Sequence, residues 1–239
     1  MGCNHCRERC PDEEQLLRER QGALRLHLVK TKTLYETFTL LARGNSLNAK
    51  AFEDAVEKLN LCVSSTAFPG LLEQFYESLK GEAGLPLQSL QLLAVLLGSS
   101  LPSERADFLF QAYDSAYSLQ LSKATIEQLV REITHLAVDV LGQLATNTQP
   151  INMQRYFTDL KAAREEYCQK RIADIIGDRA YVSKQEFIAL FSTNSDCQSL
   201  LTANDLRLAL FGLRKEQLVK RRAKVPPGLS LTLSTPRSE

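Results

Sequence analysis

Helix start signals recur along the sequence, and they constrain the fold more than any other feature. Pro11 precedes the carboxylates of residues 12–14, which suit the positive end of a helix dipole. Ser183 and Glu186 have the spacing of a capping box. Apolar residues between 126 and 144 keep the 3.6-residue period of an amphipathic helix. Because no stretch alternates apolar and polar residues beyond two or three positions, we predict an all-α fold.

The first and the last helix set the outline of the expected architecture. The helix opened by Pro11 is expected to be long and to continue through Leu24 and Phe38 until Gly44 and Asn45 end it. A C-terminal helix is expected after Thr202. We divide the chain into a flexible N-terminus (1–10), a first pair of helical units (11–100), a second pair (101–213), and a basic helix end with a disordered tail (214–239).

Four helix junctions share two hydrophobes that lie five residues apart. The pairs are Leu47/Phe52, Leu85/Leu90, Leu121/Ile126 and Val182/Phe187. This repetition resembles the EF-hand, in which the first hydrophobe joins a short β-bridge to the partner loop and the second starts the core face of the exit helix. The resemblance implies EF-hand-like helix–loop–helix pairs. The simpler alternative is four helix–turn–helix units that share only their capping rules.

The loops of these units do not carry a calcium-binding set. Calcium takes about 6–8 oxygen ligands, with Gly at loop position 6 and a bidentate Glu at position 12. If Asp114 is position 1 of the third loop, Leu119 replaces the Gly and Thr125 replaces the Glu. The fourth loop keeps Glu186 at position 12 but starts at Ile175. No loop keeps two carboxylates in register, so we expect degenerate loops without metal or other cofactor.

The amino terminus resembles an acylation signal. In Met1-Gly2-Cys3-Asn4-His5-Cys6, removal of Met would leave the Gly2 amine for myristoylation, although Cys6 stands where Ser or Thr is usual. One myristoyl chain anchors a protein only marginally. Residues 1–20 carry four Arg and five acidic residues, a net charge of −1, so electrostatics in this segment do not supply the second signal. We therefore expect palmitate on Cys3, with Cys6 as a further acceptor.

Two alternatives stay open for this segment. Zinc would use Cys3, His5, Cys6 and Cys10, but four ligands within eight residues leave no room for a knuckle. The other alternative is an unmodified, frayed terminus.

Composition excludes several classes of protein. Twenty-nine Lys and Arg against 28 Asp and Glu give a net charge of +1, so we expect no nucleic-acid partner. The longest apolar run is residues 92–97, whereas a membrane span needs about 20 residues. No apolar segment follows Met1 as in a secretory signal. We expect an intracellular, reduced protein in which Cys62, Cys168 and Cys197 act as small core hydrophobes.

Catalytic signals are missing from the sequence. It contains no nucleophile elbow, phosphate-binding loop or dinucleotide fingerprint. His27 and His135 are expected to lie on helices without a carboxylate or cysteine partner at metal spacing. The basic group from Arg214 to Lys224 is interpreted as a solvated helix end, with membrane-surface binding or nuclear import as the sharper alternatives. We predict that the protein is not an enzyme and has no catalytic residues.

The helices also resemble a known family region. The segments 34–38, 88–98 and 126–144 are similar to the amino-terminal half of the myristoylated, lysosomal mTOR-associated members of the TLDc family. The similarity covers about residues 1–150, and the β-rich TLDc domain of that family is absent here. Calcineurin B-like proteins and neuronal calcium sensors resemble the architecture more distantly. Both resemblances imply a signalling or adaptor module at a membrane.

These observations lead to one main hypothesis. We expect a lipid-anchored, non-enzymatic EF-hand-like adaptor that binds a partner protein through helical grooves. Its place would be the cytoplasmic face of the plasma membrane or of a lysosomal or other endomembrane, with a cytosolic pool. The alternatives are a calcium-responsive EF-hand regulator of an enzyme or channel and, least favoured, an enzyme with an unrecognised site.

Overall fold

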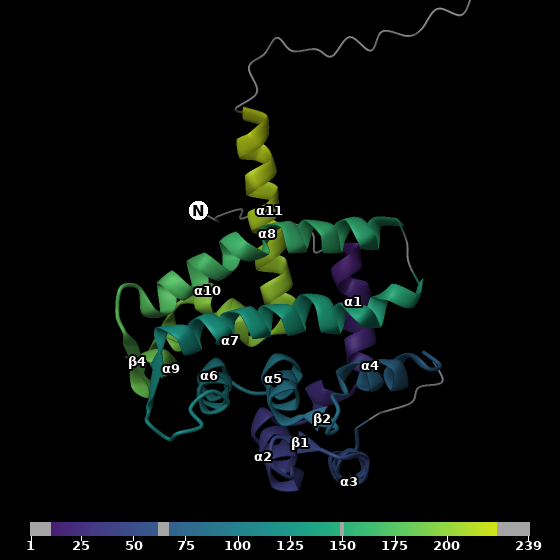
Figure 1. Cartoon of the computed structure of the whole chain (residues 1–239). Coiled ribbons are helices and arrows are strands. Elements are labelled where there is room, and N and C mark those ends of the chain that lie inside the picture. Colours follow the sequence, from purple (N-terminus) through teal and green to yellow (C-terminus); the bar gives the residue numbers. More distant parts are fainter. Residues whose placement is uncertain (1–10, 62–66, 149–150, 224–239) are drawn as a thin grey trace, which may run out of the picture.

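The computed structural model describes residues 11–61, 67–148 and 151–223, and these ranges are helical nearly throughout (Figure 1). The strands within them are two or three residues long. The all-α class is therefore confirmed. In this part of the chain no helix is long and apolar enough to cross a bilayer. The predicted segment 1–10 and most of the predicted segment 214–239, residues 224–239, lie outside the described residues.

The first helix is shorter than predicted. Helix α1 covers Asp12–Ala23, a 3-10 turn η1 covers Leu26–Leu28, and α2 covers Thr31–Leu41. Arg25 lies in the left-handed region with φ of 63°, and its N–H donates to the Gly22 carbonyl. A left-handed residue ends a helix in this way. The prediction of one helix through Phe38 is therefore wrong, and the apolar pattern continued because both helices face the same core.

Two helix–strand–helix units form the first pair. The first unit consists of α2, β1 (Ser46–Leu47) and α3 (Ala49–Leu59), and the second of α4 (Leu71–Leu79), β2 (Leu85–Pro86) and α5 (Leu87–Leu97). The strands are antiparallel, with Leu47 opposite Leu85. Both leucines are buried. The first hydrophobes of two predicted pairs thus lie side by side and join the units.

The second pair repeats this arrangement with longer strands. Its units are α6 (Pro102–Gln111), β3 (Gln120–Ser122), α7 (Lys123–His135), and then α8 (Ile151–Ile176), β4 (Tyr181–Ser183), α9 (Lys184–Thr193). Leu121 lies opposite Val182 in the antiparallel ribbon. The capping box predicted at Ser183 and Glu186 is present. Phe110 and Phe187, both fully buried, face each other with ring centroids 5.5 Å apart.

The segment after α7 changes its winding. A π-helical stretch, Leu136–Val140, leads into the 3-10 segment Leu141–Thr148. The Arg207 guanidinium donates to the carbonyl of Ala137 at 2.9 Å, and Arg20 donates to the carbonyl of Leu144 at the same distance. The 3.6-residue pattern predicted one regular helix to Leu144. The α-helix instead ends at His135, and buried arginines bind carbonyls of the irregular continuation.

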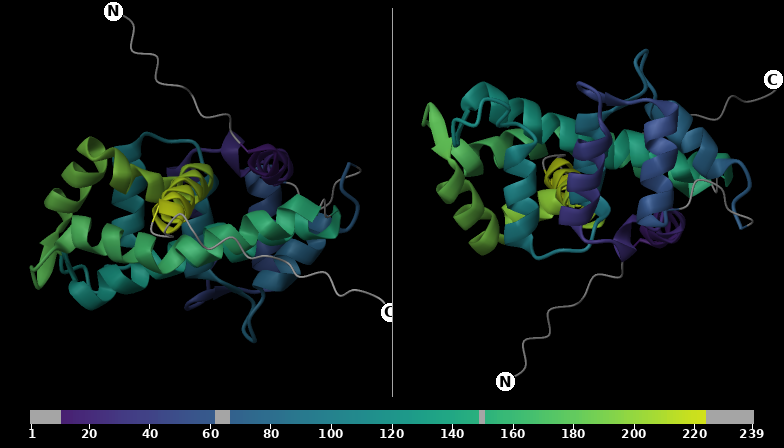
Figure 2. Two further views of the ribbon diagram at one scale, coloured as in Figure 1. Left: turned by 90° about the horizontal axis from the view of Figure 1, so that it is seen from above. Right: turned by 90° about the horizontal axis from the view of Figure 1, so that it is seen from below.

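The described part of the chain ends in α10 (Ser195–Gln198), the 3-10 turn η4 (Ser199–Leu201) and α11 (Ala203–Ala223), which is the predicted C-terminal helix. Helices α7 and α8 run side by side, and α11 crosses them transversely (Figures 1 and 2). Arg207 of α11 and Glu14 of α1 have no exposed surface, and their guanidinium and carboxylate meet through two contacts of 2.7 and 2.8 Å. This buried ion pair joins the first and the last α-helix of the described chain.

Candidate functional site

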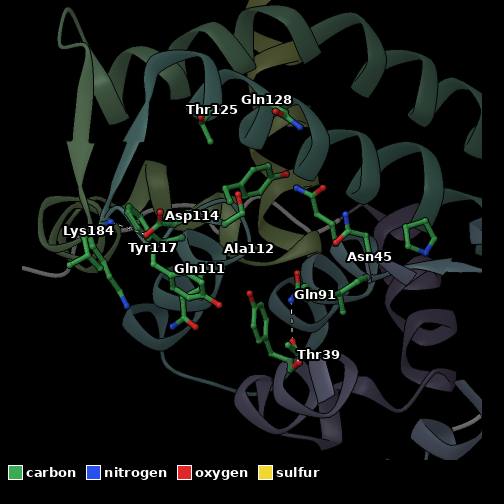
Figure 3. A pocket seen from close by; sticks show the side chains of 18 residues that line it. Thr39, Asn45, Gln91, Gln111, Ala112, Asp114, Tyr117, Thr125, Gln128 and Lys184 are labelled. Atoms are coloured by element: carbon green, nitrogen blue, oxygen red, sulfur yellow. Dashed lines mark hydrogen bonds between the residues drawn. The ribbon is translucent and has the colours of Figure 1, made fainter. Parts of the chain in front are cut away.

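A large hollow lies between the two pairs of units. It has a volume of about 1040 Å³ and is bordered by α2 and α5 on one side and by α6 and α7 on the other (Figure 3). We call it the inter-pair groove. Its polar lining is mostly uncharged and includes Thr39, Asn45, Gln88, Gln91, Gln111, Thr125 and Gln128. Such a lining offers hydrogen bonds without selecting strongly for charge.

Tyrosines on the groove wall stay protonated. Burial raises the pKa of Tyr35, and burial together with a hydrogen bond to Glu132 raises the pKa of Tyr113. The Tyr113 hydroxyl donates to Glu132 at 2.6 Å. Both phenols are therefore hydrogen-bonding groups at neutral pH and not activated nucleophiles.

The third loop borders the groove and is closed by its own side chains. Asp114, at loop position 1, accepts the backbone N–H groups of Ser118 and Leu119 at 2.8 and 2.9 Å, and the Ser118 hydroxyl at 2.9 Å. That hydroxyl lies 2.8 Å from the carbonyl of Gln120. Desolvation raises the pKa of Asp114, but these hydrogen bonds outweigh it and the pKa is lowered. Oxygens that a cation would require are thus held by hydrogen bonds within the loop.

Two bulky residues of this loop adopt a left-handed backbone. Tyr117 has φ of 54° and Leu119 has φ of 58°, and their side chains are 89% and 59% exposed. Left-handed geometry costs a non-glycine residue about 1–2 kcal/mol. Leu119 stands at loop position 6, where the calcium-binding pattern requires Gly. The loop thus keeps a strained turn although its sequence lacks the residue suited to it.

The fourth loop is closed by a guanidinium group. Arg179 donates to the carbonyls of Ile175 and Ile176 at 2.9 and 3.2 Å, and its Nη1 lies 3.1 Å from Oε1 of Glu186. Glu186 also accepts the backbone N–H and the hydroxyl of Ser183. Those bonds lower the pKa of Glu186. The carboxylate predicted at position 12 is therefore occupied by its own loop, which sequence spacing alone did not reveal.

The remaining candidate groups do not form a reactive centre. The His135 imidazole lies 2.8 Å from the carboxylate of Asp139, so the expectation that it has no carboxylate partner is wrong. Lys161 and Arg164 contact the same carboxylate. Across the described ranges, no three His, Cys, Asp or Glu side chains gather as a metal site would require.

The described cysteines behave as the sequence predicted. Cys168 and Cys197 are buried and unpaired by any disulfide. Burial raises the pKa of both thiols, that of Cys197 to about 12. They remain protonated at neutral pH and are poor nucleophiles. Cys62 lies outside the described residues.

The predicted lipidation residues Gly2, Cys3 and Cys6 also lie outside the described residues. The described chain starts at Pro11, directly before α1. The Glu14 carboxylate, in the first turn of α1, accepts the hydroxyl of Tyr156 of α8 at 2.9 Å. The start of α1 is thereby held beside α8.

Comparison with known proteins adds no relative. No family model, curated protein or solved structure matches this chain.

Proposed function

We propose that the protein is a non-enzymatic, EF-hand-like adaptor that binds a helix of a partner protein in the inter-pair groove. The pairing of Leu47 with Leu85 and of Leu121 with Val182 supports the EF-hand-like assignment, because these are the residues that the hydrophobic spacing marks for a bridge between loops. The observation that carries the functional part is the groove itself. It lies between the two pairs, and its wall has uncharged amides and hydroxyls.

The closed loops favour an adaptor over a sensor. A calcium sensor changes shape because the ion draws loop oxygens together. Here Asp114 and Ser118 close the third loop, and Arg179 with Glu186 closes the fourth. Their geometry requires no ion. The calcium-responsive regulator of an enzyme or channel therefore remains the alternative, and calcium titration separates the two.

The membrane part of the proposal concerns the segment before α1. Myristate on Gly2 with palmitate on Cys3, and on Cys6 as a further acceptor, would hold the adaptor at the cytoplasmic face of a membrane. The resemblance to the TLDc-family region belongs to the same proposal and supports localisation to a lysosomal or other endomembrane.

A site-specific cross-linker tests partner binding. A photoreactive phenylalanine analogue at Gln111, exposed at the groove, should give a discrete cross-linked adduct in cells of the source organism. The matched control places the same group at Gln15, exposed on α1, and should not give that adduct. Equal adducts from both positions, or none from Gln111, would contradict groove binding.

Cell fractionation tests the anchor. Gly2→Ala should move the protein from membrane to cytosol, Cys3→Ser should reduce membrane residence, and a Cys3/Cys6 double variant should reduce it further, because one chain binds only marginally. Zinc binding predicts another order, in which Gly2→Ala is harmless and each cysteine change is equally damaging. If Gly2→Ala distributes like the wild type, the anchor proposal is wrong.

A further inference from the structure

Helix α11 has two halves with different surroundings. In the first half Leu206, Arg207 and Leu210 have no exposed surface. Toward its C-terminal end the helix rises past α8 and projects from the body (Figure 1). We call residues 214–223 the α11 end. Most of the described side chains of the α11 end are therefore exposed, and packing within the protein does not account for its apolar residues.

The α11 end combines exposed apolar residues with positive charge. Val219 is 66% exposed and Leu218 is 36% exposed. Residues 214–223 contain five Lys or Arg and one Glu, a net charge of +4, so the rest of the chain carries −3 against a total of +1. A helix with apolar and basic residues together is typical of a membrane-surface contact. The charge of the protein is thus strongly uneven, although its total is close to zero.

Contacts at the base of the α11 end fix which side faces outward. Arg214 donates to Asp159 of α8 at 3.0 Å, and Gln217 donates to Glu166 at 2.8 Å. These two residues turn one side of the helix toward α8. Val219 and Lys220 are exposed beside them. The outward side is therefore presented in a defined orientation.

The start of α1 and the residues just before the α11 end pack against the same tyrosine of α8. The Tyr156 hydroxyl donates to Glu14, in the first turn of α1, and the Tyr156 ring lies 5.4 Å from that of Phe211, just before the α11 end. Both helix ends lie on the α8 side of the molecule (Figures 1 and 2). Helix α1 therefore begins on the same side of the molecule as the base of the α11 end.

We propose that the α11 end binds the surface of an anionic membrane, with its basic side chains at the lipid headgroups and Leu218 and Val219 at the headgroup–acyl boundary. Charge complementarity selects this occupant, because a cytoplasmic leaflet is negative and each Lys or Arg near it strengthens binding by a factor of about five. The α11 end would supply the electrostatic contact with the membrane that residues 1–20, with their net charge of −1, do not provide. Its biological setting rests on the proposed lipid anchor, but the contact itself does not need acylation.

Vesicle binding of the unacylated full chain tests the proposal. Vesicles of phosphatidylcholine with 30% phosphatidylserine should bind the wild type at low salt, release it as salt rises, and bind far more protein than pure phosphatidylcholine vesicles do. Replacing Lys215, Lys220, Arg221 and Arg222 by Gln should lower the partition coefficient by at least about tenfold. A Val219→Ser variant should lower it by a smaller factor, because that change removes apolar contact only.

A matched control separates this surface from general positive charge. Lys50 and Lys58 are exposed on α3, at the other end of the molecule from the α11 end (Figure 1). The Lys50→Gln/Lys58→Gln variant should bind anionic vesicles like the wild type, whereas Lys215→Gln/Lys220→Gln, which removes the same charge, should bind more weakly. Circular dichroism and melting temperature should be unchanged in both.

The outcomes distinguish this inference from the anchor. Vesicle binding that is lost equally in the two double variants, or that does not occur in the wild type, overturns the inference. A wild type that forms dimers through the α11 end without binding vesicles overturns it in favour of a second copy of the chain. If vesicle binding depends on the α11 end while Gly2→Ala leaves cell fractionation unchanged, the inference stands and the lipid anchor is wrong.

Discussion

The two pairs of units share a frame but close their loops by different chemistry. In the first pair the left-handed positions near the ribbon are Gly44 and Gly84, and the strands have two residues each. In the second pair Tyr117 and Leu119 of the third loop take left-handed positions, the fourth loop has Gly177 there, and the strands have three residues each. Glycine adopts this geometry freely. The first pair thus relies on backbone freedom, whereas the third loop, in the second pair, holds bulky residues in place with side-chain hydrogen bonds.

The aromatic residues that start two of the exit helices, one in each pair, differ in how deeply they are buried. Phe52 and Phe187 occupy the same place in their units, five residues after the first hydrophobe. Phe187 is fully buried, stacked on Phe191 at 4.4 Å and in contact with Phe110. Phe52 is only half-buried and contacts Tyr76 at 4.8 Å. Phe38 and Phe75 of the first pair are also buried, so the difference lies in the aromatic residue that starts the exit helix.

The largest effect is expected from the aromatic core. Phe187→Ala or Phe110→Ala should lower the free energy of unfolding by about 3–5 kcal/mol, because each removes a fully buried ring and leaves a cavity. Phe52→Ala, the matched change in the first pair, should cost about 1–2 kcal/mol because its ring is partly exposed. Denaturant unfolding measures all three. Near-neutral values for Phe110 and Phe187 would mean that the repeat assignment is wrong.

The residues of the two ribbons show how much of the fold the sequence can predict. The spacing of hydrophobes identified Leu47, Leu85, Leu121 and Val182 as ribbon residues, because a strand residue and a helix residue five positions later must both face one core. Arg25 gave no such signal, since nothing in a run of helix-forming residues marks one of them for a left-handed turn. The first helix was therefore predicted too long.

Long-range polar contacts were not predictable in this way. Glu14 and Arg207 lie 193 positions apart, and each resembles an ordinary charged helix residue in the sequence. Only the packing of α1 against α11 brings them together in the interior. The groove also arises between elements: its polar residues come from five helices and two loops, and no spacing connects them. Periodicity reports on faces of single elements, so it misses sites that arise between elements.

The second largest effect is expected from a glycine of the first pair whose backbone conformation suits glycine alone. Gly84 has φ of 116°, and a Cβ there would lie 2.3 Å from the Leu47 carbonyl oxygen of the facing strand. Gly84→Ala should therefore lower the free energy of unfolding by about 2–3 kcal/mol, through backbone strain and a forced shift of the ribbon. Thermal or denaturant unfolding measures the loss.

The control for this prediction has the opposite sign. Leu119→Gly removes left-handed strain of about 1–2 kcal/mol but adds backbone entropy to the unfolded chain, which offsets about 0.5–1 kcal/mol. Because the Leu119 side chain is 59% exposed, little packing is lost. Stability should stay equal or rise slightly. A large loss with Leu119→Gly would show that the side chain supports the loop, contrary to the comparison.

A smaller effect is expected from the carboxylate that closes the third loop. Asp114→Asn should lower the free energy of unfolding by about 1–2 kcal/mol at neutral pH, because it weakens charge-assisted hydrogen bonds from Ser118 and Leu119. The pKa of Asp114 is lowered in the folded protein, so its contribution is present above the ordinary Asp pKa and is lost as pH falls through the lowered value.

The pH profile provides the control for Asp114. The difference in stability between wild type and Asp114→Asn should shrink as the pH falls below about 4, because protonation of Asp114 makes the two alike. Glu82→Gln, a matched change at an exposed residue beside the first ribbon, should leave the acid limb of the profile unchanged. Parallel profiles for wild type and Asp114→Asn would contradict the proposed closure.

The smallest expected effect is that of calcium, which should leave helicity and melting temperature unchanged at millimolar concentration. The first pair offers the ion no loop with two carboxylates in register, and in the second pair Asp114 and Glu186 are each engaged by groups of their own loop. Arg179→Ala should release Glu186 from its guanidinium partner, yet one carboxylate is too few for calcium, so this variant should also be indifferent. Isothermal titration of both proteins, with magnesium as the control ion, measures calcium binding.

A micromolar site in the wild type would favour the calcium-responsive regulator, whereas a site that appears only in Arg179→Ala would show that the guanidinium alone excludes the ion. Indifference of both proteins means that the two pairs, although closed by different chemistry, share one property: neither needs an ion to hold its ribbon.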